Sequence, residues 1–124
     1  MTVSGVIPQI RTTNLGESID FYVSKLGFEL EFTYRDFYAG IRVSDQSFHV
    51  KLVDHEDPSI PFVADHGHLH LYFTTDDVDG EAQRLRRNGV LLREDVANTP
   101  WGTREFSVLD NQGHVLCFGQ GVSE

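Results

Sequence analysis

The sequence is 124 residues long, and its 40% share of apolar residues is sufficient for the core of a globular domain. Its formal net charge of −9 argues against a nucleic-acid-binding surface, which needs a basic face. Such a charge would attract a cationic small molecule; the alternative is that it serves solubility alone. No apolar stretch is long enough to span a membrane, Cys117 alone cannot form an internal disulfide, and the first residues lack a signal-peptide pattern. We therefore expect a cytoplasmic protein with neither a nucleic-acid nor a membrane partner.

A first helix is predicted over residues 15–25, because apolar residues recur there at helical spacing. Asn14 can cap the free backbone N–H groups, Glu17 stands at the capping-box position, and Gly27 can adopt the left-handed conformation that ends a helix. The buried face is expected to consist of Leu15, Ile19, Tyr22, Val23 and Leu26.

After this helix the apolar period falls to two, which is typical of strands with one buried face. The buried set comprises Phe48, Val50 and Leu52, and it alternates with His49, Lys51 and Val53. Residues 55–61 contain two prolines and little periodicity, so this segment is interpreted as a connector.

The same order of elements then recurs. A second helix is expected after a cap at Asp76 or Asp77, with Gly89 at its end. Its buried stripe consists of Val78, Ala82 and Leu85. The flanking strands alternate again, with Leu69, Leu71 and Phe73 against His68, His70 and Tyr72, and with Phe106 and Val108 against Glu105 and Ser107. Glu105 and the adjacent Arg104 are interpreted as a surface ion pair.

This internal repeat predicts an α+β fold made of two strand-helix-strand-strand-strand (βαβββ) modules. We expect a single domain over residues 1–124, with one module at about 3–54, a linker at 55–66 and a second module at 67–120. One face of each sheet must carry the helix, whereas the other face holds polar and aromatic groups. Such a mixed face can stay solvated or curl around a ligand.

Several motifs resemble a known family. They are Pro8, residues 18–22 (Ser-Ile-Asp-Phe-Tyr), 26–28 (Leu-Gly-Phe), 100–106 (Pro-Trp-Gly-Thr-Arg-Glu-Phe) and 110–114 (Asp-Asn-Gln-Gly-His). In their order and spacing, the chain resembles the glyoxalase/bleomycin resistance/dioxygenase (vicinal oxygen chelate) superfamily, and within it the bleomycin resistance proteins. The resemblance implies that the modules form open-barrel cups, and that a homodimer exchanges strands or pairs modules around a ligand groove.

The resemblance also implies which residues line that groove. In bleomycin resistance proteins aromatic rings sandwich the planar tail of the drug, and Phe32 and Trp101 match those positions best, while Phe37 and Tyr38 compete for a third. The expected ligand-binding set is Phe32, Phe37, Tyr38, His49, His70, Tyr72, Trp101 and Gly102. The alternatives are core packing for Phe32 and Phe37, and a seal of the dimer interface for Trp101.

Enzymes of the superfamily hold a divalent metal through four strand positions, which the resemblance carries onto Ile7, Lys51 or His49, His70 and Cys117. Isoleucine cannot ligate a metal, so we expect no metal cofactor; if one binds, His70, Cys117 and His49 are the candidate ligands. His68 and His70 lie two residues apart, which is a recurrent metal arrangement. They are equally interpretable as polar residues of a half-exposed strand, and Cys117 as a small buried hydrophobe.

We therefore expect a binding protein without catalytic residues, which sequesters a planar, cationic antibiotic. The alternative is a metal-dependent enzyme of the superfamily, namely a glyoxalase-like lyase or isomerase, a ring-cleaving dioxygenase or a thiol transferase. A third interpretation keeps the binding function and replaces the drug by a metabolite, because a fold does not determine its ligand.

Overall fold

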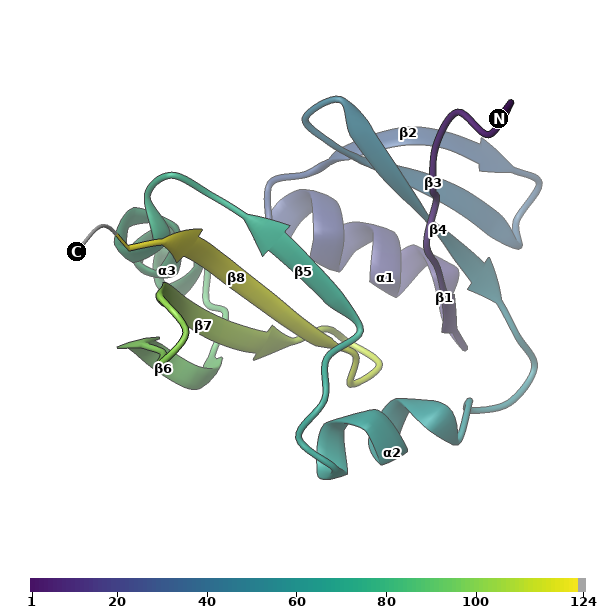
Figure 1. The fold of residues 1–124 in the computed structure, drawn as a ribbon. Coiled ribbons are helices and arrows are strands. Elements are labelled where there is room, and N and C mark those ends of the chain that lie inside the picture. Colours follow the sequence, from purple (N-terminus) through teal and green to yellow (C-terminus); the bar gives the residue numbers. More distant parts are fainter. Residues whose placement is uncertain (123–124) are drawn as a thin grey trace. The chain divides into compact units, whose positions relative to one another are not determined.

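The computed structural model describes residues 1–122, whose contacts divide them into two compact units, residues 1–57 and residues 58–122. The first unit contains the strands β1 (Gln9–Thr12), β2 (Glu29–Tyr34), β3 (Tyr38–Val43) and β4 (Gln46–Leu52), together with α1 (Leu15–Asp20) and η1 (Phe21–Lys25). The strands form one sheet in the order β1-β4-β3-β2, in which β1 and β4 are parallel (Figure 1).

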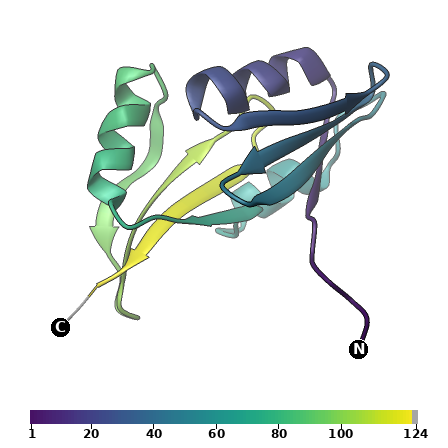
Figure 2. The ribbon, with the colours of Figure 1, turned by 90° about the horizontal axis from the view of Figure 1, so that it is seen from above.

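Helix α1 lies along one face of this sheet (Figure 2). The alternating apolar side chains Phe48 and Val50 of β4 are buried. Asn14 caps α1 as predicted, because its Oδ1 accepts a hydrogen bond from Glu17 N at 3.1 Å. The helix predicted over residues 15–25 matches α1 and η1 taken together. Its second half, η1, has π-helical hydrogen bonding. Gly27 follows with φ of 80°, the left-handed conformation expected of it.

The second unit repeats this plan. It contains β5 (Leu71–Thr74), α3 (Val78–Arg87), β6 (Leu92–Asn98), β7 (Thr103–Leu109) and β8 (Val115–Gly121), preceded by α2 (Ser59–Asp65). Its sheet has the order β5-β8-β7-β6, with β5 parallel to β8 (Figure 1). The two strand orders correspond element by element, which confirms the predicted α+β fold of two βαβββ modules. No helix within residues 1–122 is long and apolar enough to cross a membrane.

Helix α3 begins at Asp77, one of the two predicted caps, whose Oδ1 accepts a hydrogen bond from Gly80 N at 3.1 Å. The predicted stripe Val78, Ala82 and Leu85 is buried. Two local expectations differ from the structure. The segment interpreted as a connector contains α2, and β5 begins only at Leu71, because a turn with Gly67 at φ of 74° separates α2 from the strand. His68 and Leu69 therefore precede the strand rather than alternate within it.

Candidate ligand-binding site

In the first unit, the face of the sheet opposite α1 carries a row of residues brought together by strand register. Gln9 in β1 pairs with His49 in β4, His49 pairs with Gly40 in β3, and Gly40 pairs with Phe32 in β2. Because side chains alternate along a strand, Tyr38 lies on the same face as Gly40. The row therefore joins three of the predicted ligand-binding residues, Phe32, Tyr38 and His49.

These three rings form a cluster. Phe32 stacks on Tyr38 with ring centroids 6.3 Å apart, and it meets His49 edge to face at 5.3 Å. Gln9 Nε2 donates a hydrogen bond to the Tyr38 hydroxyl oxygen at 3.2 Å, and the same hydroxyl lies 2.8 Å from His49 Nδ1. If Tyr38 donates to Nδ1, the proton of neutral His49 is on Nε2. Phe32 is 37% exposed, so it is not part of the core.

The ring contact of Phe37 is made outside this cluster. Phe37 packs edge to face on Tyr34 with centroids 5.6 Å apart, at the tip of the hairpin between β2 and β3, and it is also exposed. Tyr38, rather than Phe37, is therefore the ring that adjoins Phe32. The core-packing alternative fails for both phenylalanines.

In the second unit, Tyr72 in β5 donates a hydrogen bond to Glu105 Oε2 in β7 at 2.7 Å. Thr103 Oγ1 donates to the same oxygen at 2.9 Å. Burial, followed by the hydrogen bond and the charge of Glu105, raises the pKa of Tyr72 to about 12. Burial and the same carboxylate raise the pKa of Cys117, which pairs with Tyr72 in the ladder, to about 12. Both groups are therefore neutral at physiological pH.

The interpretation of Glu105 as a partner of Arg104 is wrong. Arg104 forms its ion pair with Asp79 at 3.0 Å, because adjacent residues of a strand point to opposite faces. Glu105 consequently shares the face of Thr103 and Ser107 on β7. The alternation of side chains along this strand already separates Glu105 from Arg104 in the sequence, and it could have identified Glu105 as a residue of the other face.

In each unit a glycine leaves the space that an aromatic side chain needs to cross the neighbouring strand. Strand β8 lies between β5 and β7, and Tyr72 crosses it above Gly119, where a β-carbon would collide with the Tyr72 hydroxyl group. Strand β3 lies between β2 and β4, and the Phe32 ring lies over Gly40 in the same way. In both sheets the aromatic ring thereby reaches a polar residue two strands away.

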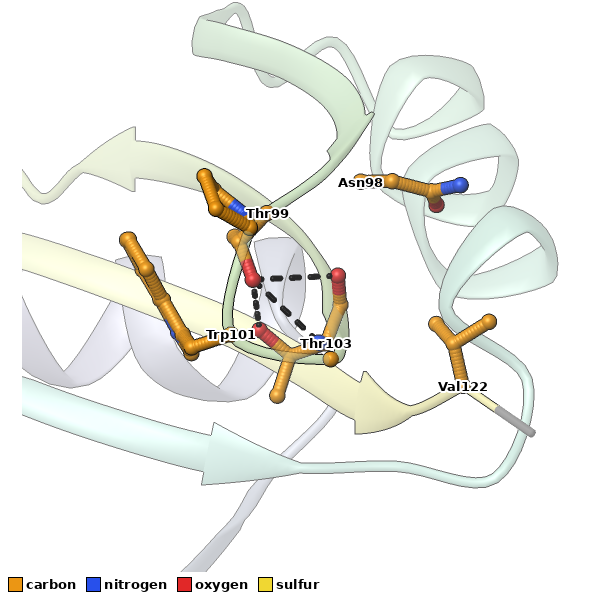
Figure 3. Close-up of a pocket in the computed structure, with 7 residues that line it drawn as sticks. Asn98, Thr99, Trp101, Thr103 and Val122 are labelled. Carbon is orange, nitrogen blue, oxygen red and sulfur yellow. Dashed lines mark hydrogen bonds between the residues drawn. The ribbon is translucent and has the colours of Figure 1, made fainter. Parts of the chain in front are cut away.

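Trp101 and Gly102 lie in the hairpin turn between β6 and β7. Thr99 and Thr103 close this turn through a contact of 2.8 Å between their hydroxyl oxygens, and Gly102 has φ of 89°. The turn borders an open cavity of about 430 Å³, lined by Asn98, Thr99, Pro100, Trp101, Gly102, Thr103 and Val122. Figure 3 shows the indole projecting from one side of the turn, with Asn98 and Val122 on the other. Trp101 is 71% exposed.

His70 has a different environment. Its Nδ1 accepts a hydrogen bond from Val115 N at 2.9 Å, and its ring meets His114 edge to face at 4.8 Å. His114 is buried and lies 2.8 Å from Asp110 Oδ2 through its Nδ1. This arrangement secures the turn before β8.

The candidate metal ligands do not fit a metal site. His70 Nδ1 accepts from Val115 N, which leaves the proton of the neutral ring on Nε2, burial keeps the Cys117 thiol protonated, and Ile7 has no donor atom. Thiolate, not thiol, is the metal-binding form of cysteine. Within residues 1–122, no group of three or more His, Cys, Asp or Glu side chains is placed to hold a metal ion.

Solved structures share this fold over nearly the whole chain. TnmS3, an antibiotic binding protein from Streptomyces sp. CB03234, is 28% identical, with a TM-score of 0.72 and 98% of each chain covered. The bleomycin-binding protein of Streptomyces verticillus, complexed with copper(II)-bleomycin, is 24% identical, with a TM-score of 0.71 and coverage of 100% of this chain and 99% of that one. Lactoylglutathione lyase from Agrobacterium tumefaciens is 16% identical, with a TM-score of 0.73 and coverage of 96% and 95%.

No curated protein sequence matches the chain. A family model matches residues 6–118, which is most of the sequence. That model describes the Glyoxalase/Bleomycin resistance protein/Dioxygenase superfamily, whose solved members include both binding proteins and enzymes. The chain belongs to this superfamily.

Proposed function

We propose that this protein sequesters a planar, cationic antibiotic by stacking it on exposed aromatic side chains, without chemical conversion. The single observation that carries the proposal is the ring cluster Phe32, Tyr38 and His49 on an open sheet face. Flat, rigid rings offer a large contact area at little cost in conformational entropy, which suits aromatic ligands. Tyr72 and Trp101 add two exposed rings in the second unit.

Two further observations support the proposal. TnmS3, a protein 28% identical over 98% of the chain, is an antibiotic binding protein. The net charge of −9 favours a cation over an anion of the same shape. The metal-dependent enzyme is less well supported, because Ile7 has no donor atom and Val115 N occupies the Nδ1 lone pair of His70.

We further propose a homodimer with the ligand groove at its interface. The argument is the exposed edge strand β2, in which Leu30, Phe32 and Tyr34 all present large apolar groups to solvent. Exposed apolar edges are commonly covered by another chain. Light scattering coupled to size-exclusion chromatography tests this: a dimer mass is expected, and a monomer mass at all concentrations would overturn it.

The binding proposal is tested by fluorescence, because Trp101 is the only tryptophan in the chain. Bleomycin and the planar cation proflavine serve as probes, with the anionic dye 1-anilinonaphthalene-8-sulfonate as a charge control. Saturable quenching by a cationic probe is expected, together with a smaller effect of the anion. No saturable response, and no heat in calorimetry, would overturn the proposal.

Variants then locate the binding surface. Phe32→Ala is expected to weaken binding of the responding probe about tenfold or more, since stacked rings contribute on the order of 1–3 kcal/mol. Phe62→Ala is the matched control, because Phe62 is another exposed phenylalanine. It lies in α2, outside the ring cluster, where it stacks on His66. Equal losses in both variants would contradict the assignment.

A further inference from the structure

We propose that Glu105 is the specificity-determining residue for the positive charge of the ligand, and that it selects an N–H-bearing cation such as an ammonium or guanidinium group. This inference rests on the proposed binding function and adds the ligand chemistry to it. Three observations carry it: the way the carboxylate is held, the lack of a cationic partner, and its link to the cavity beside Trp101.

The carboxylate is held from two sides. Tyr72 and Thr103 both donate to Oε2, at 2.7 and 2.9 Å, so this oxygen is fixed in place. The Cys117 thiol also hydrogen-bonds to this carboxylate. A carboxylate fixed in this way needs little reorganisation before it accepts a further hydrogen bond from a ligand.

No protein cation neutralises this charge. Within residues 1–122 no ion pair includes Glu105, whereas two other acidic residues of this unit have arginine partners: Asp79 pairs with Arg104 at 3.0 Å, and Asp95 with Arg86 at 2.7 Å. The hydroxyl and thiol groups around Glu105 are neutral at physiological pH, since the pKa values of Tyr72 and Cys117 are raised to about 12. The negative charge is therefore available to an external cation.

Thr103 connects this carboxylate to the cavity. Its side chain lines the cavity with Trp101 and also donates to Glu105. Residues 103 and 105 lie on the same face of β7, because they are two apart on one strand. Tyr72, which is 41% exposed, lies on the other side of the carboxylate. An aromatic cation that contacts one of these rings can thus bring its N–H group to Glu105, where a charge-assisted hydrogen bond replaces hydration.

The test compares two probes that share the naphthylmethyl group and differ in a cationic or a neutral head group: naphthalen-2-ylmethylammonium and naphthalen-2-ylmethanol. Affinities for the full chain are measured by NMR titration, in which the Trp101 indole N–H signal reports local binding. We expect the wild-type protein to prefer the ammonium probe about tenfold, as a single charge-assisted hydrogen bond would give. Glu105→Gln is expected to abolish this preference, because the affinity for the ammonium probe falls more than the affinity for the alcohol.

Glu94→Gln is the matched control. It removes the same charge from the same sheet, where Glu94 accepts a hydrogen bond from Ser107 Oγ at 3.0 Å. Retention of the ammonium preference in this variant supports a specific role of Glu105. Equal losses in both variants would overturn it in favour of a diffuse field, and an unchanged preference in Glu105→Gln would overturn it outright. If the wild-type protein binds neither probe, the proposed function fails as well.

Discussion

The Tyr72 hydroxyl group donates a hydrogen bond of 2.7 Å to Glu105 across the strand that separates them. Between the two lies Gly119, and a β-carbon there would collide with the hydroxyl group and lie 3.2 Å from Glu105 Cγ. The absence of one carbon atom in β8 therefore determines whether the phenol reaches the carboxylate. Several consequences of such contacts can be measured.

Gly119→Ala is expected to break the hydrogen bond between Tyr72 and Glu105. Because that bond and the charge of Glu105 help to raise the pKa of Tyr72 to about 12, the pKa should fall toward the ordinary value of 10.0. NMR titration of carbon-13-labelled tyrosine measures this change. Gly121→Ala is the control, since a β-carbon at 121 meets no atom within 4 Å, and the pKa of Tyr72 should remain raised in it.

Cys117 makes the fold sensitive to alkaline pH. Its pKa is raised from 9.0 to about 12 in the folded chain, mainly by burial, so its contribution to stability is complete below pH 9. Above that pH the unfolded chain releases the thiol proton and the folded chain retains it, so stability falls as pH rises toward 12.

Urea unfolding of the wild-type protein and of Cys117→Ala, at about pH 8 and about pH 10.5, tests this linkage. The free energy of unfolding should drop less with pH in the variant, because tyrosines and other groups titrate in both proteins. Parallel losses in the two proteins would show that the thiol has no part in the alkaline instability.

The cap of α3 depends on Asp77 rather than on its neighbour. Asp77→Ala removes the acceptor of Gly80 N and should lower the free energy of unfolding by about 1 kcal/mol. Asp76→Ala should change it by less than about 0.5 kcal/mol, as expected of a surface site. Chemical denaturation measures both, and a larger loss for Asp76→Ala would contradict the assigned cap.

Asp110 and His114 form a buried pair, with side chains 1% and 3% exposed. Asp110→Asn places an amide donor near His114 or withdraws an acceptor from Gln112 N and His114 N. We expect a loss of about 1–3 kcal/mol in the free energy of unfolding, the cost of an unsatisfied buried polar group. Asp45→Asn, in the exposed turn between β3 and β4, should be almost neutral; thermal or urea unfolding separates the two.

Local chemistry explains which parts of the fold could be predicted. The cap Asn14, the choice of Asp76 or Asp77 as the second cap, and the stripe of α3 depend on neighbours within one or two turns, and they were predicted from spacing alone. Helix α2 was not predicted, because its sequence contains Pro61 and lacks a clear apolar period. The fold class followed from the repeat, whose two halves have corresponding strand orders.

The candidate site was harder to predict, because its contacts join strands that are far apart in the sequence. Tyr72 and Glu105 are 33 residues apart, and Gln9 and Tyr38 are 29 apart. His68 and His70 have the two-residue spacing of a recurrent metal arrangement. In the structure, however, His70 Nδ1 accepts a hydrogen bond from Val115 N, which no local sequence pattern indicates. Whether the predicted ligand-binding residues bind a common ligand remains a prediction.

The position of β8 in the second sheet has a consequence for synthesis on the ribosome. Among the strands of residues 1–122 it comes last in the sequence, yet it lies between β5 and β7 and alone pairs with β5. Until residues 115–121 leave the exit tunnel, β5 has no partner in its sheet and one side of β7 is open. Unpaired strand edges of this kind promote association between chains. A stalled chain that ends before β8 would therefore be a substrate for chaperones rather than a partly functional protein.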